Sequence, residues 1–332
     1  MQIRTNIENL ARYKKYLSFK NSLRMFLNNE GFLDLDLPVL TPYLIPEAYL
    51  EVFETEYFHF DKKEKLYLTP SPELFIKRLL VEGISDCFYL GKSFRNNEAP
   101  SSKHSPEFTM LEIYKTNANY MDMAETVLRL LRHLSNFFNK EDYIYYDNKK
   151  ISFSSFEKIT VAEAFSKFAQ ISQEVLFDKI KFLKIAKDKG YVTEGFTYED
   201  LWSQIYTQEI EPFLGTNGFP TLIYDYPTVF APLSKQKNKL VSERFEFYIN
   251  GVELGNCYTE LSDYKIQNER LIKEEQERKN SGKIVVRYDT GFINALKKGL
   301  PDCAGIAIGV ERLGMIFCGI TQIEDLKILD IC

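Results

Sequence analysis

Residues 244–261 read RFEFYINGVELGNCYTEL, and this stretch decides the predicted fold class. Asn250 and Gly251 stand between two alternating runs, and Asn-Gly in this setting is the strongest short-range signal for a β-hairpin. Residues 87–95 and 107–115 are predicted to be two more strands, joined by a polar loop. Strands paired through hairpins form antiparallel sheets, and helical segments are grouped between them here. The sequence therefore predicts an α+β fold, with an antiparallel sheet flanked by helices.

The helices and the remaining strands follow from periodicity and end signals. Residues 8–30 carry apolar side chains near helical spacing, which predicts one amphipathic helix. Ser71, Pro72 and Glu73 supply an N-cap, a first-turn proline and an acid, so we expect a second helix there. Without a visible repeat or linker, residues 1–332 are expected to form a single domain with an insertion at about 120–220. The other expected elements are strands at 33–37 and 221–226, a helix at 120–140, a mostly helical segment at 160–215, a helix or mobile arm at 263–283, and a glycine-rich turn leading into an apolar helix at 302–318.

The composition argues against several classes of protein. With 42 Lys+Arg against 47 Asp+Glu, the formal net charge is −5, which disfavours a protein that holds nucleic acid mainly through its phosphates. No run approaches the roughly 18 apolar residues of a membrane span, and the N-terminus lacks an apolar export segment, so we expect a cytoplasmic protein. Five cysteines without a C-x-x-C pair and three histidines disfavour zinc ribbons and multi-histidine metal sites. Any catalysis is then expected to rely on carboxylates, arginines and a bound ligand.

Acidic residues recur at a spacing of seven across the predicted hairpin, at Glu246, Glu253 and Glu260. The two-residue turn predicts that Tyr248 pairs with Glu253, which places Glu246 and Glu253 on one face as diagonal neighbours. Two carboxylates suit Mg²⁺, although the spacing alone favours a solvated strand face over a metal site. Glu260 has the wrong parity to join them unless the strand gains one residue. We predict such a bulge at residues 255–256.

Three segments resemble, in order, motifs 1, 2 and 3 of class II aminoacyl-tRNA synthetases. They are the first helix with the strand ended by Pro38, the run from Phe94-Arg95 to Tyr114, and the run GIAIGVER at 305–312. The closer match is the lysyl-tRNA synthetase subclass, which is similar at AYLEV (48–52), SPEL (71–74), PEFTMLE (106–112) and ELGN (253–256). The resemblance covers nearly the whole chain. It implies that ATP and Mg²⁺ are used to convert an amino acid into an aminoacyl-adenylate.

The resemblance also implies roles for individual residues. Arg95 would hold the α-phosphate of ATP and the substrate carboxylate, while His104 and Arg312 would hold the distal phosphates, which makes Arg95 and Arg312 the catalytic pair. Motif 2 normally places a glutamate two residues after its arginine, where this chain has Asn97 and then Glu98, so either side chain is a candidate for the adenine contact. The implied ATP site is Arg95, Asn97, Glu98, His104, Glu253, Gly309 and Arg312; the implied Mg²⁺ ligands are Glu246 and Glu253; and the implied substrate site is Ser71, Glu73, Glu112, Tyr114, Asn256, Glu260 and Ala307.

The N-terminal region and residue 307 bear on the acceptor of the activated amino acid. Lysyl-tRNA synthetases carry an anticodon-binding domain ahead of motif 1, whereas motif 1 begins here near the first residue. The chain therefore resembles the stand-alone paralogs that attach (R)-β-lysine, or lysine, to a lysine of elongation factor P as a post-translational modification. Ala307 fits them, since lysyl-tRNA synthetases typically have glycine there. A truncated lysyl-tRNA synthetase and a non-catalytic regulator are the alternatives, and motif 1 implies a homodimer with residues 33–38 at the interface.

Overall fold

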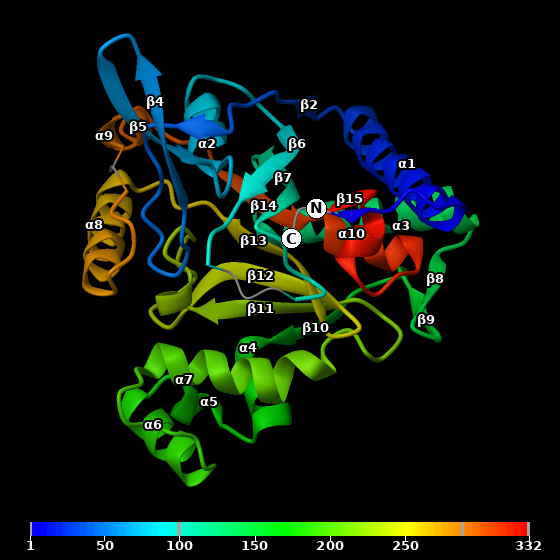
Figure 1. Ribbon diagram of the computed structural model, residues 1–332. Coiled ribbons are helices and arrows are strands. Elements are labelled where there is room, and N and C mark those ends of the chain that lie inside the picture. The colour runs from blue at the N-terminus through cyan, green and yellow to red at the C-terminus, as the bar shows by residue number, and fades with distance from the viewer. Residues whose placement is uncertain (1, 98–100, 287–288, 331–332) are drawn as a thin grey trace. The chain divides into compact units, whose positions relative to one another are not determined.

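The computed structural model describes residues 2–97, 101–286 and 289–330, and the chain forms two compact units (Figure 1). The terminal unit comprises Met1–Asn119 and Glu260–Cys332, and the middle unit comprises Tyr120–Thr259. None of the helices among the described residues is long and apolar enough to cross a membrane.

The terminal unit is built on four strands in the order β14-β7-β6-β2. Strand β7 pairs antiparallel with β6 on one side and with β14 on the other, and β2 pairs parallel with β6. The four strands are β2 (Leu33–Asp34), β6 (Cys87–Phe94), β7 (Glu107–Thr116) and β14 (Cys303–Gly309). The helices are α1 (Ile7–Asn29), α2 (Glu73–Val81), α8 (Tyr264–Asn280), α9 (Thr290–Leu296) and α10 (Val310–Cys318), with a 3₁₀ turn at Ile323–Leu326. Smaller sheets join β1 (Gln2–Ile3) to β15 (Leu329–Asp330), and β3 (Leu40–Thr41) and β4 (Phe53–His59) to β5 (Lys62–Leu68).

Helix α1 shows why this sequence packs as it does. Asn6 caps the helix by accepting a hydrogen bond from the Asn9 amide at 2.8 Å, and its inner face buries Phe19 and Leu23 completely. Helix α10 approaches so closely at Gly314 that a Cβ atom there would lie 2.8 Å from the Tyr16 ring. A glycine at this position therefore permits the two helices to meet.

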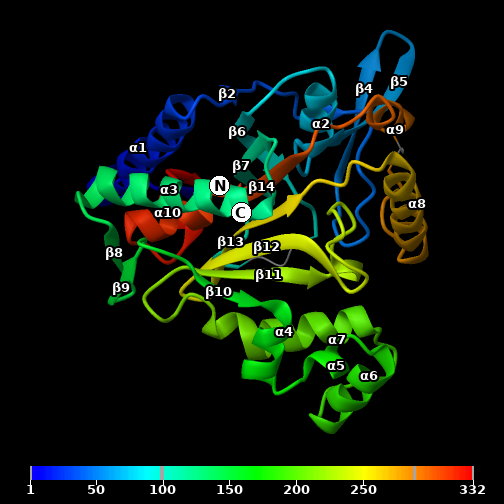
Figure 2. The ribbon, with the colours of Figure 1, turned by 180° about the vertical axis from the view of Figure 1, so that it is seen from behind.

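The middle unit contributes four strands in the order β10-β11-β12-β13, and β8 and β9 form a separate two-stranded sheet. Helices α4 to α7 are grouped beside β10 and β11, as both views show (Figures 1 and 2). Their core is aromatic, with Phe165, Phe182 and Trp202 buried together. The strands are β8 (Tyr143–Tyr146), β9 (Lys149–Ser152), β10 (Glu157–Thr160), β11 (Thr221–Pro227), β12 (Val241–Ile249) and β13 (Val252–Thr259). The helices are α3 (Tyr120–Asn139), α4 (Val161–Ala164), α5 (Gln173–Leu176), α6 (Lys179–Asp188) and α7 (Tyr198–Ile205), with π-helical turns η1 (Phe165–Ala169) and η2 (Tyr206–Ile210) and 3₁₀ turns η3 (Glu211–Phe213) and η4 (Thr228–Phe230).

The predicted fold class is confirmed: the sheets are mainly antiparallel and helices flank them. The hairpin turn is confirmed too, because Asn250 and Gly251 both have positive φ (48° and 69°). Tyr248 pairs with Glu253 as predicted. Whether the chain works as a single catalytic domain with an insertion stays a prediction.

Three local expectations are corrected. The bulge lies at Leu254, one residue before the predicted position, and its side chain is buried, so the extra residue is accommodated in the core. Residues 303–309 form strand β14 rather than a turn, paired along its whole length with β7. Of the strand expected at 33–37, only Leu33 and Asp34 form a strand, β2. Its parallel pairing with Cys87 and Phe88 ends after these two residues.

Candidate active site

Three buried carboxylates of the terminal unit surround one buried lysine. Glu73 begins α2, Glu112 lies on β7, and Glu260 follows the end of β13. Lys77, one turn along α2, pairs with Glu73 and lies 2.5 Å from Glu260 Oε2. All four side chains are at most 7% exposed. The structure thus brings together three of the residues that the resemblance assigned to the substrate's ammonium groups.

Hydrogen bonds orient Glu112 within this cluster. Ser71 Oγ donates to Glu112 Oε2 at 2.9 Å, and the Tyr114 hydroxyl donates to Glu112 Oε1 at 3.2 Å. Ser71 Oγ also accepts from the Glu73 amide at 3.1 Å, while Pro72 is the N-cap residue of α2 and makes no side-chain cap bond. The predicted capping role of Ser71 is therefore replaced by one that ties the start of α2 to β7.

The charges in the cluster do not balance. Burial raises the pKa of Glu112 to about 8, and the neighbouring charge of Glu73 adds to the effect. Burial likewise raises the pKa of Glu260 to about 8, although Lys77 opposes the shift. Burial lowers the pKa of Lys77, but the charges of Glu260 and Glu73 outweigh it and the pKa is raised. At neutral pH the two carboxyl groups with raised pKa values therefore largely hold their protons, and a cationic ligand can take the place of those protons.

Strand β14 passes directly beside the carboxylates. Gly305 pairs with Tyr114, and Ala307 pairs with Glu112. A Cβ atom at position 305 would lie 2.5 Å from Glu260 Oε1 and 2.7 Å from the Tyr114 ring, so only glycine fits without displacement. The methyl group of Ala307, in contrast, stands on a half-buried position opposite Glu112.

The predicted phosphate ligands His104 and Arg312 meet at the surface of the terminal unit. Arg312 Nη2 lies 2.6 Å from His104 Nε2, and Arg312 Nε donates to the Lys103 carbonyl at 3.2 Å. Because arginine only donates, Nε2 of His104 accepts, and its Nδ1–H donates to Ser101 Oγ at 2.7 Å. The structure therefore brings together the two side chains that were expected to bind phosphate oxygens. Gly309 precedes α10, and a Cβ there would touch Arg312 at an ordinary 3.7 Å.

Arg95 follows the end of β6, and its guanidinium lies over the Phe108 ring at 5.3 Å. Asn97 is exposed, has φ of 56°, and donates its amide to Asn96 Oδ1 at 2.8 Å. Glu98, the other candidate for the adenine contact, lies outside the described residues. The choice between Asn97 and Glu98 stays open.

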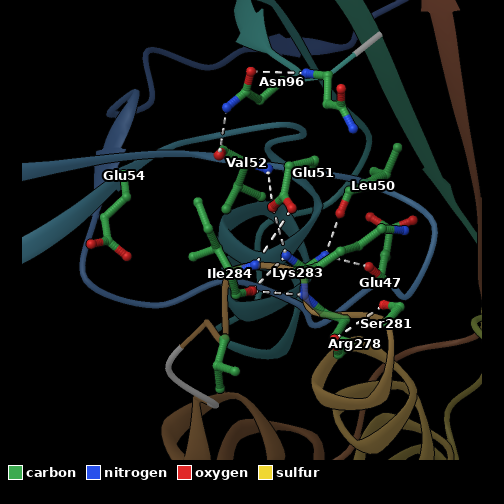
Figure 3. Close-up of polar contacts among 12 residues, drawn as sticks. Glu47, Leu50, Glu51, Val52, Glu54, Asn96, Arg278, Ser281, Lys283 and Ile284 are labelled. Atoms are coloured by element: carbon green, nitrogen blue, oxygen red, sulfur yellow. Dashed lines mark hydrogen bonds and ion pairs between the residues drawn. The ribbon is translucent and has the colours of Figure 1, made fainter.

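A buried arginine that the sequence did not single out holds the backbone next to Arg95 (Figure 3). Arg278, on α8, is 1% exposed, donates to the Glu47 carbonyl at 2.7 Å, and pairs with Glu51 Oε1 at 3.2 Å. The Glu51 carbonyl in turn accepts from the Asn96 amide at 3.0 Å. The residue after Arg95 is thereby tied to α8.

Glu47 is a fourth carboxylate close to this site. Burial and the charge of Glu73 raise its pKa to about 7, and Arg95 opposes the shift. Glu47 lies in the stretch IPEA (45–48), which also carries the resemblance, but only its three-dimensional neighbours give it a place beside the site.

The middle unit carries the three remaining predicted site residues, Glu246, Glu253 and Asn256. Glu246 Oε2 accepts from the Tyr226 and Tyr248 hydroxyls at 2.7 Å each, and Oε1 accepts from Arg244 Nη2 at 2.5 Å. Arg244 Nε donates to Asn256 Oδ1 at 3.0 Å. Burial and the charge of Glu246 raise the pKa of both tyrosines.

The two carboxylates of the hairpin fit the requirements of Mg²⁺. Glu253 is half-buried, and among the described residues Oε1 of Glu246 accepts from Arg244 alone, where a carboxylate oxygen can accept two hydrogen bonds. Within the described parts of the chain, no group of three or more His, Cys, Asp or Glu residues could hold a metal ion. Two carboxylate ligands with water and phosphate completing the shell is the arrangement that Mg²⁺ commonly adopts.

Comparisons with known proteins agree with this geometry. Residues 3–329 match the family described as tRNA synthetases class II (D, K and N), and the chain belongs to this family. Class II synthetases use ATP and Mg²⁺.

Among curated relatives, the lysine–tRNA ligase of Baumannia cicadellinicola is 33% identical over 97% of this chain and 63% of its own length. Those of Clostridium perfringens (strain SM101 / Type A) and Carboxydothermus hydrogenoformans are each 32% identical, over 98% and 92% of this chain and 65% and 62% of their own lengths. The chain thus spans less than two thirds of the length of these relatives.

Proposed function

We propose that this protein uses ATP to convert a lysine-type amino acid into an aminoacyl-adenylate. The observation that carries the proposal is the cluster of Glu73, Glu112 and Glu260, which is buried and contains one lysine. A buried surplus of carboxylates favours either protons or a cationic ligand, and an amino acid with two ammonium groups supplies two positive charges. The family membership supports the same reaction class.

The substrate provides the nucleophile in this reaction. One carboxylate oxygen attacks the α-phosphorus of ATP, the bond to the β-phosphate breaks, and pyrophosphate leaves. Arg95 would neutralise the substrate carboxylate and the α-phosphate, while His104 and Arg312 would hold the distal phosphates. Glu246 and Glu253 would hold Mg²⁺, which supplies charge neutralisation at phosphate oxygens. The protein's own task is therefore positioning and charge balance.

We further propose that the activated amino acid is (R)-β-lysine or lysine and that the acceptor is a lysine of elongation factor P. The neutral amine of the acceptor attacks the adenylate carbonyl, AMP leaves, and the amine loses its proton as the amide bond forms. Ala307 supports this choice, since its methyl group lies opposite Glu112 where lysyl-tRNA synthetases typically have glycine. One methyl group reshapes the pocket only modestly, but it can favour a differently placed amine.

Charging of tRNA is the second candidate. The observation in its favour is that the curated relatives are named lysine–tRNA ligases. The net charge of −5 weighs against it, because RNA binding relies on phosphate contacts.

One experiment separates these functions. The protein is incubated with ATP, Mg²⁺ and either isomer of lysine, together with purified elongation factor P or tRNA for lysine, and the acceptors are analysed by intact mass and acid-gel shift. Pyrophosphate exchange into ATP is measured in parallel. Exchange with a lysine isomer supports activation, and a mass gain on elongation factor P supports the protein acceptor. Robust charging of tRNA with unmodified elongation factor P would contradict our choice of acceptor.

A matched pair of variants tests whether the buried carboxylate cluster binds the substrate. Glu260→Gln should reduce exchange by at least about 100-fold, because the buried ammonium groups lose a charged partner. Glu64→Gln changes an exposed strand residue in the same way and should exchange like the wild type. We also propose a homodimer, as motif 1 implies, and a cytoplasmic location; both stay predictions.

A further inference from the structure

Three tyrosine hydroxyls of the middle unit converge on one oxygen of Glu246. Tyr226 and Tyr248 each lie 2.7 Å from Oε2, and Tyr206 lies 3.5 Å from it. The Tyr206 hydroxyl is also 2.8 Å from that of Tyr226 and 3.2 Å from that of Tyr248. We call Tyr206, Tyr226 and Tyr248 the tyrosine cage; all three are at most 6% exposed.

The cage has a consequence for how Glu246 can act. Each hydroxyl carries one hydrogen, and a carboxylate oxygen accepts about two hydrogen bonds. The hydrogen of Tyr226 occupies one acceptor position of Oε2, while that of Tyr248 is shared between Oε2 and Glu211 Oε1, which lies 3.1 Å from the Tyr248 hydroxyl. Oε2 is therefore the more heavily engaged oxygen of Glu246. Oε1 accepts from Arg244 alone among the described residues and keeps one acceptor position. The cage thus decides which oxygen of Glu246 remains available.

Tyr206 adds a contribution from a distant part of the sequence. It begins the π-helical turn η2, directly after α7, whereas Tyr226 and Tyr248 lie on β11 and β12. Its ring stacks on Trp202, with centroids 4.8 Å apart and planes 10° from parallel. Its hydroxyl contacts those of both cage partners and so adds hydrogen bonds to the network around Glu246. π-Helical turns occur often at functional sites.

We propose that the tyrosine cage positions Glu246 for metal binding, and that Tyr206 couples the helical segment of the middle unit to this task. The proposal rests on the proposed function, because it takes Glu246 to be a Mg²⁺ ligand. Tyr206 is a positioning residue: it touches neither substrate nor metal. A purely structural cage is the competing explanation, since buried hydroxyl groups need partners in any case.

The chain offers a matched control in Tyr198. This tyrosine is 5% exposed and lies in the same aromatic core. Its hydroxyl donates a hydrogen bond to the Leu176 carbonyl at 2.8 Å. Tyr206→Phe and Tyr198→Phe each remove one buried hydroxyl from the helical segment. Only the first removes a hydrogen bond from the cage. If the cage is only structural, the two substitutions should have the same effect on metal binding and on activity, whatever their effects on stability.

The direct measurement is metal binding rather than turnover. Mn²⁺ is titrated into each variant with ATP present, and the free ion is followed by electron paramagnetic resonance. We expect Tyr206→Phe to need about tenfold more Mn²⁺ for half-saturation, since partners of metal ligands typically contribute 10- to 100-fold to affinity. Tyr198→Phe should bind Mn²⁺ like the wild type. In pyrophosphate exchange, Tyr206→Phe should raise the Mg²⁺ requirement and leave the KM for the amino acid unchanged.

Three results would overturn the inference: equal Mn²⁺ binding by both variants, a loss of thermal stability in Tyr206→Phe without a change in metal dependence, or a wild-type protein that binds no Mn²⁺ with ATP. Tyr226→Phe is measured in the same way, so the question does not depend on one variant folding. Failure of the proposed function is a separate result. It appears as wild-type protein that exchanges no pyrophosphate with any lysine isomer, whatever its Mn²⁺ binding.

Discussion

The carboxyl groups of Glu112 and Glu260 have pKa values of about 8 in the folded chain, against 4.5 for an ordinary glutamate. Between these values the folded state holds protons that the unfolded state has released. The stabilisation from these two groups is therefore full below about pH 4.5 and is lost as the pH rises through about 8. A bound ammonium group reverses the preference, because it favours the ionised carboxylate.

This linkage predicts that a lysine-type ligand binds with release of protons at pH 7. Calorimetry in two buffers of different ionisation enthalpy measures the number released, and affinity should rise between pH 6 and pH 8.5. Glu112→Gln should lower the proton release, since the glutamine has no proton to lose. An equal observed binding enthalpy in the two buffers would mean that no protons are released, which would contradict the raised pKa values.

A second prediction at this scale concerns Gly305. Replacement by alanine places a Cβ 2.5 Å from Glu260 Oε1, so the carboxylate must move. We expect Gly305→Ala to lower the kcat/KM for the amino acid by at least about 100-fold and to cost about 1–3 kcal/mol of stability. The KM for ATP serves as the internal control and should change little. An unchanged kcat/KM for the amino acid would show that Glu260 is not a substrate ligand.

The secondary-structure elements show which parts of the fold could be predicted from the sequence alone. The hairpin of β12 and β13 was predictable in register, because a two-residue Asn-Gly turn fixes which residues face each other. The bulge at Leu254 was misplaced by one residue, since the choice between neighbouring positions depends on which side chain the core accepts. Strand β14 was mistaken for a turn because glycines mark turns; here Gly305 is needed beside a side chain instead.

Contacts between distant segments were out of reach of local patterns. The tyrosine cage joins residues 206, 226 and 248, and each tyrosine by itself is an ordinary core residue. Arg278 stands in a charged run that resembles any solvated helix, yet it is buried. The residues that carry a family resemblance were found, whereas those that hold them in place were not.

Arg278 supplies the prediction at the scale of elements. Its guanidinium links α8 to residues 47–51, and Glu51 holds the Asn96 amide. Arg278→Lys should cost about 3–5 kcal/mol in urea unfolding, because a buried ion pair loses its fork of hydrogen bonds. Hydrogen exchange at the Asn96 amide should become faster in the same variant.

The neighbouring residue provides the control for this change. Lys279 forms an exposed pair with Glu275, and Lys279→Gln should change stability by less than about 1 kcal/mol. If both substitutions have equally small effects, the link between α8 and the strand end beside Arg95 does not exist in solution.

For the whole molecule, the prediction concerns its oligomeric state. Leu33, in the motif 1 segment, and Leu40, just after it, are 52% and 47% exposed in the single chain. We expect them to be covered in a two-fold dimer, because exposed leucines of this size favour an interface. Sedimentation equilibrium at micromolar concentration measures the mass, and Leu33→Asp should shift it toward the monomer. A monomeric wild-type protein would contradict the prediction.

Lys77 has a consequence for selectivity. Three carboxylates and one lysine leave a formal surplus of two negative charges in the buried cluster, so ligands are sorted by how much charge they bring. Norleucine and 6-aminohexanoate each carry one ammonium group and would leave one charge unbalanced. A proton on Glu112 or Glu260 can make up that difference at low pH but not above pH 8. The preference for diamino over monoamino acids should therefore increase as the pH rises. Inhibition constants measured at pH 6.5 and 8.5 would reveal this change. The solution pH thus sets how strongly the buried carboxylates select ligands by their positive charge.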